Sequence, residues 1–204
     1  AGDTLLHAEK SACGEAVLEL IELLTGSVTE QEANLLYIAV TTDTGCFQYA
    51  NTNAATLRAA ARLLELGADN RRVSMEFFRK ISRARMALVG HIYSGMRFFR
   101  GGQIAIAVVT RALIDALQAT EDDCDDIAGL PGRADGVVVS VTIRELTDGR
   151  SKISVRTPPE VDSCAICAVY GGGGHKMASG CTLTCDPEMA VEKILAAIDQ
   201  VWPA

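Results

Sequence analysis

The stretch VYGGGGHKMASG, residues 169–180, places four consecutive glycines directly before His175 and Lys176. Glycine loses more conformational freedom on folding than any other residue, so four in a row are costly. Successive backbone N–H groups in such a loop can form a concave anion site, and His175 and Lys176 add donors at its rim. The alternative is a flexible loop without a ligand. The residues that we expect to contact an anionic ligand are Gly171, Gly172, Gly173, Gly174 and His175.

The position of this glycine run excludes two common nucleotide motifs. The Gly-x4-Gly-Lys-Ser/Thr spacing of a P-loop is absent. A dinucleotide-binding loop follows a strand, whereas this run precedes the predicted strand GCTLTC at residues 180–185.

The C-terminal half has the pattern of an α/β domain. MRFFRGGQIAIAVVT (96–110) predicts two strands around a Gly-Gly turn. GVVVSVTIREL (136–146) and SKISVRT (151–157) flank an Asp-Gly turn, which predicts a second hairpin. Short helices are expected after Thr110, in the acidic run from Glu121 and after Asp162, and a last helix begins at Asp186-Pro187. We therefore expect, over residues 96–204, a mixed sheet of about five strands flanked by helices.

The N-terminal half has only helical patterns. SACGEAVLELIELLTGS (11–27) predicts a helix that ends at Gly26. Thr29 and Glu32 form a capping box before a second helix at about 30–41, and a third helix follows Asn53. A fourth helix is expected from near Asn70, with Val73, Phe77, Ile81 and Leu88 on its buried side. Residues 1–82 are thus predicted as one domain, 83–95 as a helical connector and 96–204 as a second domain.

Composition and charge limit the function. The 204 residues carry a net charge of −7, which argues against a general nucleic-acid binder. Ten basic residues between Arg58 and Arg100 face only three acidic ones, a distribution that suits a small anion, a short nucleic acid or simply a solvated helix face. No apolar run approaches the ~18 residues of a membrane span, so no membrane partner is expected. The seven scattered cysteines indicate a reducing, cytoplasmic environment.

Two further residues are candidates for phosphate chemistry. Asp43, in TTDTGCFQYANT (41–52), lies on a short turn between Thr42 and Thr44, a setting that suits Mg²⁺ or Mn²⁺ but is also common in purely structural turns. Arg156 ends the predicted strand SKISVR, where its guanidinium group could hold a phosphate or belong to an ordinary surface arginine.

Zinc is the competing interpretation of the C-terminal motifs. Its candidate ligands are Cys164, Cys167, His175, Cys181 and Cys185. Against it, the first two cysteines lie inside an apolar helical pattern and no second Cys-x2-Cys pair is present. The last two have the same-face spacing of a strand, which suits core packing. The acidic run 121–126 is expected to be a solvated helix start.

Three stretches together resemble the DHH/DHHA1 phosphoesterases. TDTGCFQYANT (42–52) resembles the third motif of the DHH domain, and YGGGGHKMASG (170–180) resembles the GGGH signature of the DHHA1 domain. KISVR (152–156) resembles the strand that supplies the substrate arginine of that domain. Order and spacing are similar to those of the nano-RNase/pAp-phosphatase branch over nearly the whole chain.

The resemblance implies hydrolysis of short oligonucleotides, 3′-phosphoadenosine 5′-phosphate or both, with two Mn²⁺ or Mg²⁺ ions. Asp43 is then a metal ligand, and Arg156, His175 and the loop Gly171–Gly174 hold the phosphate or terminal nucleotide. The alternatives are a phosphodiesterase for linear or cyclic dinucleotides, an exopolyphosphatase and a non-catalytic nucleotide-binding module. Homo-oligomerisation is left open.

The sequence departs from this family at its metal motifs. Asp-His-His does not occur, the sole Asp-x-Asp pattern lies in the acidic run 121–126, and the three histidines are His7, His91 and His175. Residues 1–82 are therefore expected to be the C-terminal part of a DHH domain and residues 96–204 a DHHA1 domain. Because one carboxylate cannot hold two ions, we expect this portion alone to be nearly inactive.

Overall fold

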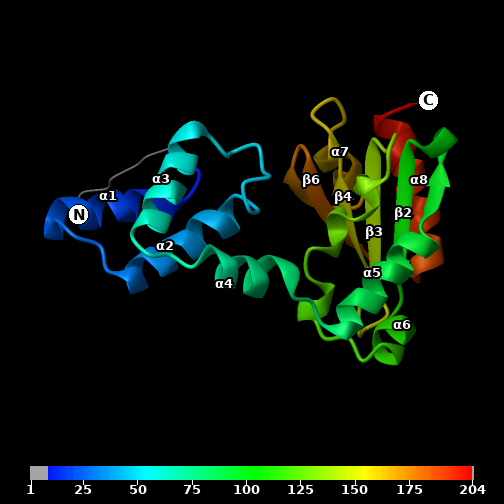
Figure 1. The fold of residues 1–204 in the computed structure, drawn as a ribbon. Helices are drawn as coiled ribbons and strands as arrows, with labels where there is room; N and C mark the ends of the chain where they lie inside the picture. The colour runs from blue at the N-terminus through cyan, green and yellow to red at the C-terminus, as the bar shows by residue number, and fades with distance from the viewer. Residues whose placement is uncertain (1–8, 204) are drawn as a thin grey trace. The chain divides into compact units, whose positions relative to one another are not determined.

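The computed structural model describes residues 9–203, which form two compact units. The first unit extends to Lys80 and the second begins at Ile81. Figure 1 colours the chain from blue at its N-terminus to red at its C-terminus. No helix in the described part of the chain combines the length and the apolar character needed to cross a bilayer.

The first unit is entirely helical, as predicted. Its helices are α1 (Cys13–Thr25), α2 (Glu30–Asp43), α3 (Ala54–Glu65) and α4 (Asn70–Ser74). Leu18, Leu36, Val40 and Leu63 are among the buried residues of their shared core. Residue 43 thus ends α2, two residues beyond the predicted end of that helix.

Local capping groups set the helix ends. Gly26 adopts the left-handed conformation, with φ of 69°, and closes α1. Thr29 and Glu32 form the predicted capping box, in which the Thr29 N–H donates to Glu32 Oε2 at 2.8 Å. Asn53 Oδ1 accepts from the Ala55 N–H at 2.8 Å and starts α3. These predictions are confirmed, because each depends on residues only two to four positions apart.

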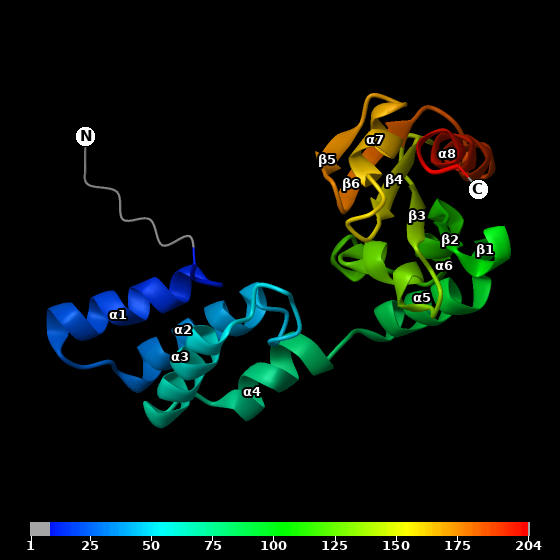
Figure 2. The same cartoon turned by 90° about the horizontal axis from the view of Figure 1, so that it is seen from above.

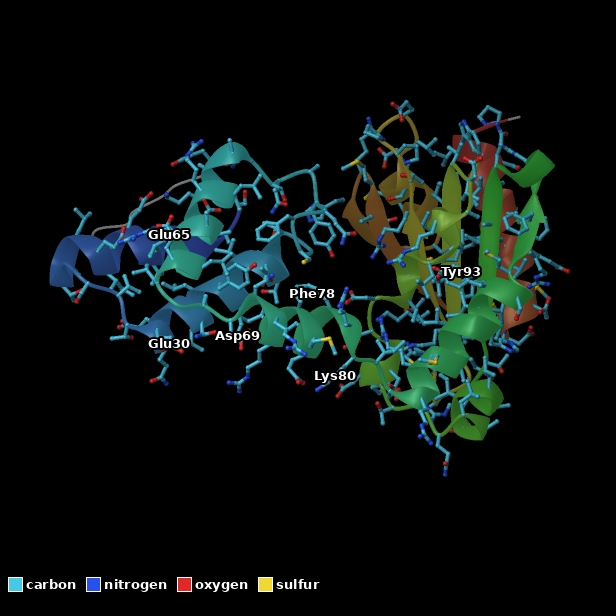
Figure 3. The ribbon with its side chains drawn as sticks, in the orientation of Figure 1. Glu30, Glu65, Asp69, Phe78, Lys80 and Tyr93 are labelled. Carbon is cyan, nitrogen blue, oxygen red and sulfur yellow. The ribbon has the colours of Figure 1, made fainter. Side chains whose placement is uncertain are left out.

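The predicted fourth helix is wrong in its length. After α4 the chain forms a π-helical turn at Met75–Arg79, then leaves the helix at Lys80, which has an extended backbone. Figure 3 labels Phe78 and Lys80 of this segment. A new helix, α5 (Arg83–Gly95), begins with the Ser82 side chain accepting from the Arg85 N–H.

This break changes which side chains of the segment are buried. Val73 and Leu88 are buried as expected, but Phe77 and Ile81 are 51% and 47% exposed. The π turn alters the rotation between successive residues, so the 3.6-residue pattern does not continue from α4 into α5.

The second unit is built on a six-stranded mixed sheet, which confirms the predicted α/β class. Its strands are β1 (Arg97–Phe99), β2 (Ile104–Val109), β3 (Val139–Glu145), β4 (Ser151–Arg156), β5 (Gly173–His175) and β6 (Ala178–Leu183). Their order is β1-β2-β3-β4-β6-β5, and only β2 and β3 pair in parallel. Both predicted hairpins are present. The strand beyond the five expected is β5, which forms inside the glycine run.

Helices and short turns surround this sheet. Besides α5, they are α6 (Arg111–Ala116), α7 (Ser163–Ala168), α8 (Pro187–Val201) and four 3₁₀ turns at Arg100–Gly102, Asp122–Cys124, Ile127–Gly129 and Pro131–Arg133. Thr110, Asp162 and Asp186 accept from backbone N–H groups at the starts of the three helices, as predicted. The acidic run 121–126 forms one 3₁₀ turn, at Asp122–Cys124, instead of the expected helix start.

The two faces of the sheet are covered differently. One face packs on α7 and α8 and includes Ile106, Val141, Ile153, Ile166 and Ile194 in its core. Figure 2 shows α8 on this side and α5 and α6 on the other. On that other face, Ala107 and Val109 of β2 pack with Leu88, Ile92 and Ile114.

The rest of this second face lies over β4, β6 and β5, and we call it the exposed half-face. Its residues follow from the strand register. They are Lys152, Ser154, Arg156, Gly173, His175, Ala178, Gly180 and Thr182. All are exposed or half-buried.

Candidate functional site

Arg156 and His175 lie in one row across three neighbouring strands. Arg156 of β4 pairs with Ala178 of β6, and Ala178 pairs with His175 of β5. Directly opposed residues of paired strands project from the same face, and strands lie ~4.8 Å apart. The two side chains therefore flank the small methyl group of Ala178 on the exposed half-face, with their Cα atoms about 10 Å apart.

Arg156 has no carboxylate partner among residues 9–203. Its Nη1 donates to the Val155 carbonyl at 3.0 Å. Within residues 9–203 no ion pair to Arg156 is formed, and the side chain is half-buried at the end of β4. A guanidinium group in this position can bind a phosphate with two parallel hydrogen bonds.

The glycine run divides into two halves with different roles. The N–H groups of Gly171 and Gly172 donate to the Ala168 and Cys167 carbonyls, each at 3.0 Å, and close α7. These two N–H groups are therefore not the free donors that an anion nest needs. Gly173 and Gly174 lie in the edge strand β5, which pairs with one neighbour only and so presents part of its backbone outward.

Close packing requires two of these glycines. A Cβ on Gly172 would lie 2.3 Å from the Gly180 carbonyl oxygen. A Cβ on Gly174, whose φ is +145°, would lie 2.6 Å from the Ala178 carbonyl oxygen. In contrast, a Cβ on Gly173 would meet no atom within 4 Å. Glycines at positions 172 and 174 thus allow β5 to pack closely against β6, and this packing fixes the position of His175.

Two hydroxyl residues fix the turn that follows His175. The Ser163 N–H donates to the Lys176 carbonyl at 2.8 Å, and Ser163 Oγ donates to the His175 carbonyl at 3.2 Å. The Thr157 N–H donates to the Met177 carbonyl at 3.1 Å. Neither residue was expected at the site from the sequence. Both were identifiable by their place in the chain, since Thr157 follows Arg156 and Ser163 follows the cap residue Asp162.

The candidate zinc ligands do not converge. Among residues 9–203, no three His, Cys, Asp or Glu side chains are placed to hold one metal ion. Cys167 of α7 and Cys181 of β6 are buried in the core between that helix and the sheet. His175 projects from the opposite face, because strand residues alternate between faces.

Cys167 and Cys181 instead form a hydrogen-bonded thiol pair. Their mutual hydrogen bond lowers the pKa of Cys167 to about 7 and raises that of Cys181, and burial adds to the latter rise. Ser179 Oγ also donates to Cys167 Sγ at 3.1 Å. These contacts join α7 to β6 directly beneath the glycine run.

Asp43 belongs to the first unit, where it is the exposed last residue of α2. The neighbouring hydroxyl groups of Thr42 and Thr44 donate to the carbonyls of Ile38 and Val40 within their own helix, at 2.8 and 2.7 Å. Asp43 does not belong to any metal-binding group among the described residues. These residues alone therefore do not fit a two-ion site.

Comparison with protein families identifies the second unit. A model of the DHHA1 domain matches residues 101–202, which are half of the chain. The chain belongs to the DHHA1 domain family. Within this DHHA1 match lie Arg156, the glycine run and His175.

Known proteins resemble this chain over most of its length, beyond the DHHA1 domain itself. The bifunctional oligoribonuclease and PAP phosphatase NrnA of Thermus thermophilus is 36% identical over 196 residues, 95% of this chain and 58% of that protein. A protein of the same name from Mycoplasma genitalium is 31% identical over 173 residues, 85% of this chain and 53% of that protein. The DHHA1 chain thus spans little more than half the length of these relatives.

A solved structure has a similar fold. The crystal structure of an exopolyphosphatase-related protein from Bacteroides fragilis superposes with a TM-score of 0.86 at 26% identity. The match covers 97% of the DHHA1 chain and 58% of that protein. It includes both units of the present fold.

Proposed function

We propose that this chain binds the phosphate-bearing end of a short oligonucleotide or of 3′-phosphoadenosine 5′-phosphate, as part of a hydrolase acting on phosphoester bonds. The observation that carries the proposal is the row Arg156–Ala178–His175 on the exposed half-face. Arginine supplies a permanent positive charge, histidine supplies an N–H donor, and the alanine between them leaves room for a phosphate. Relatives named as oligoribonuclease and PAP phosphatase support this choice of substrate.

The metal requirement is a separate part of the proposal. We propose that hydrolysis uses Mn²⁺ or Mg²⁺, with Asp43 as one ligand. The described residues do not complete such a site, so the 204-residue chain is expected to bind substrate without hydrolysing it. Release of adenosine 5′-phosphate from the bisphosphate by this chain in the presence of Mn²⁺ would contradict the expectation of inactivity.

We propose a cytoplasmic location for the protein. All seven cysteines are free thiols, including the buried pair Cys167 and Cys181. Free thiols are the usual state in a reducing compartment.

Calorimetry on the 204-residue chain tests the binding proposal. With 3′-phosphoadenosine 5′-phosphate in EDTA buffer, we expect micromolar affinity without any metal. Arg156→Ala removes a charge-assisted contact and should weaken binding roughly tenfold or more. The matched control is Arg150→Ala, which removes an exposed arginine that pairs with Asp148 on the β3–β4 turn. Equal binding by wild type and Arg156→Ala would overturn the proposal.

Polyphosphate is the second candidate substrate, because the similar crystal structure bears the name exopolyphosphatase-related. Competition separates the two candidates. Adenosine bisphosphate should displace a fluorescent dinucleotide at a much lower concentration than tripolyphosphate does. The opposite order would favour the polyphosphate alternative.

A further inference from the structure

A concave surface lies beside Arg156, on the side of β4 away from His175. Its volume is about 360 Å³, and Arg156 and Arg133 both line it. Ser140 of β3, which also lines it, pairs with Arg156 in the sheet register. The row of the exposed half-face therefore continues past Arg156 into this cavity.

One wall of the cavity is a 3₁₀ turn that packs tightly against the sheet. The 3₁₀ turn Pro131–Arg133 packs on β3 so closely that a Cβ on Gly132 would lie 2.9 Å from Ser140 Oγ. Pro131 is buried, and the Arg133 N–H donates to the Leu130 carbonyl at 3.1 Å. Arg133 thus projects from a fixed turn.

The two arginines of this cavity differ from most other arginines of the second unit. Five other arginines of the unit have carboxylate partners, namely Arg97, Arg100, Arg111, Arg144 and Arg150. Neither arginine of the cavity forms an ion pair within the described chain, although the protein as a whole has a net charge of −7. Two uncompensated cations at a concave surface attract an anionic ligand.

The remaining residues that line the cavity suit the planar ring of a nucleotide base. Val137, Val138 and Pro158 provide apolar surface, and guanidinium planes stack on planar bases. An inorganic anion would not use such walls, whereas a nucleotide combines a phosphate with an apolar base.

We propose that this cavity is a subsite for one further nucleotide, next to the phosphate that Arg156 holds. Arg133 contacts the phosphate or the base of that nucleotide, and Arg156 is shared between the two subsites. This inference rests on the proposed function and makes the substrate class narrower: an oligonucleotide of at least two residues occupies both subsites, whereas a mononucleotide bisphosphate occupies only one.

Two probes and three variants test the subsite by calorimetry on the 204-residue chain in EDTA. The probes are 3′-phosphoadenosine 5′-phosphate and the dinucleotide pApA. Arg133→Ala should weaken pApA binding about tenfold and change bisphosphate binding less than twofold. Arg156→Ala should weaken both. Arg83→Ala, which removes an exposed charge of the same unit that does not line the cavity, is the control and should change neither.

A steric variant gives an independent readout. Gly129 lines the cavity, and a Cβ there would meet no atom within 4 Å. Gly129→Leu should therefore fold normally, occupy the subsite and weaken pApA binding selectively. Thermal melting verifies the fold of each variant.

The outcomes separate the two proposals. If Arg156→Ala weakens both probes while Arg133→Ala and Gly129→Leu leave pApA binding unchanged, the subsite is wrong and the proposed function stands. If Arg156→Ala changes neither probe, the proposed function itself is wrong. Equal weakening of both probes by Arg133→Ala also contradicts the subsite, because it indicates general attraction of anions.

Discussion

Strands β2 and β4 belong to the same sheet, yet they bury their side chains in different ways. Five of the six residues of β2 (IAIAVV) are buried, because helices cover both of its faces. In β4 (SKISVR) buried residues alternate with exposed or half-buried ones. The comparison shows that an uncovered sheet face leaves its trace in the sequence as polar residues at every second position. That uncovered face is where Arg156 lies.

The largest expected effect comes from placing the same charge on both strands. Ala107 and Ser154 lie in one row of one face, joined through Thr142. Ala107→Asp buries a carboxylate against Leu88 and Ile114, and should lower the free energy of unfolding by about 3–5 kcal/mol. Ser154→Asp should cost less than about 0.5 kcal/mol. Urea denaturation measures both.

Ser154→Asp also has a functional consequence. The new carboxylate would lie two residues from Arg156 on the same face, so bisphosphate binding should weaken severalfold while the fold persists. Equal stability losses for the two substitutions would break the comparison, since they would mean that the face over β4 is covered as well as the face over β2.

The next largest effect on stability distinguishes Gly172, which precedes β5, from Gly173, which lies in it. Gly172→Ala places a methyl group 2.3 Å from a backbone oxygen that cannot move aside, which should cost about 1–3 kcal/mol. Gly173→Ala meets open space and should change the free energy of unfolding by less than about 0.5 kcal/mol. Thermal melts of the two variants make the comparison. A destabilising Gly173→Ala would show that β5 is more tightly enclosed than its register implies.

The smallest effect concerns Asp123, which contacts Ser82 at the start of α5, a helix that covers one face of β2. Hydrogen bonds from Ser82 and from the backbone of Thr120, together with the charge of Arg85, lower the pKa of Asp123 below its ordinary 3.8. A depressed pKa means that the carboxylate stabilises the folded state above its unfolded-state pKa, and that this contribution disappears as the pH falls through the folded-state pKa.

Asp123→Asn should therefore lower stability slightly at neutral pH and flatten the loss of stability in acid. Urea midpoints measured from neutral to acidic pH provide the check. Asp122→Asn, at a neighbouring exposed position, is the control and should follow the wild-type curve. If both variants follow the wild-type curve, the contacts of Asp123 do not stabilise the packing of α5.

Sequence patterns predicted the parts of this fold that depend on near neighbours. The capping box of Thr29 and Glu32 and the Asp-Gly hairpin between β3 and β4 each involve residues a few positions apart. The expected helix through Phe77 and Ile81 failed, because the π turn and the exit at Lys80 interrupt a periodic pattern that continues in the sequence. The sixth strand was missed because β5 exists only through its pairing with β6.

The candidate site shows the same division. Arg156, His175 and the glycine run were identifiable as single features. Their alignment depends on the spatial order β4-β6-β5, which differs from the order of these strands along the chain. No local sequence pattern predicts this difference. Arg133 was missed because its turn reaches the site only by packing on Ser140.

The row of Arg156, Ala178 and His175 is supplied by one contiguous stretch, from β4 through α7 to β6. Contacts between residues near in sequence form quickly, and such stretches often open and close as one cooperative unit. Amide hydrogens of β4, α7 and β6 should therefore exchange with one common opening energy. A ligand that bridges Arg156 and His175 would raise that energy for the whole stretch at once.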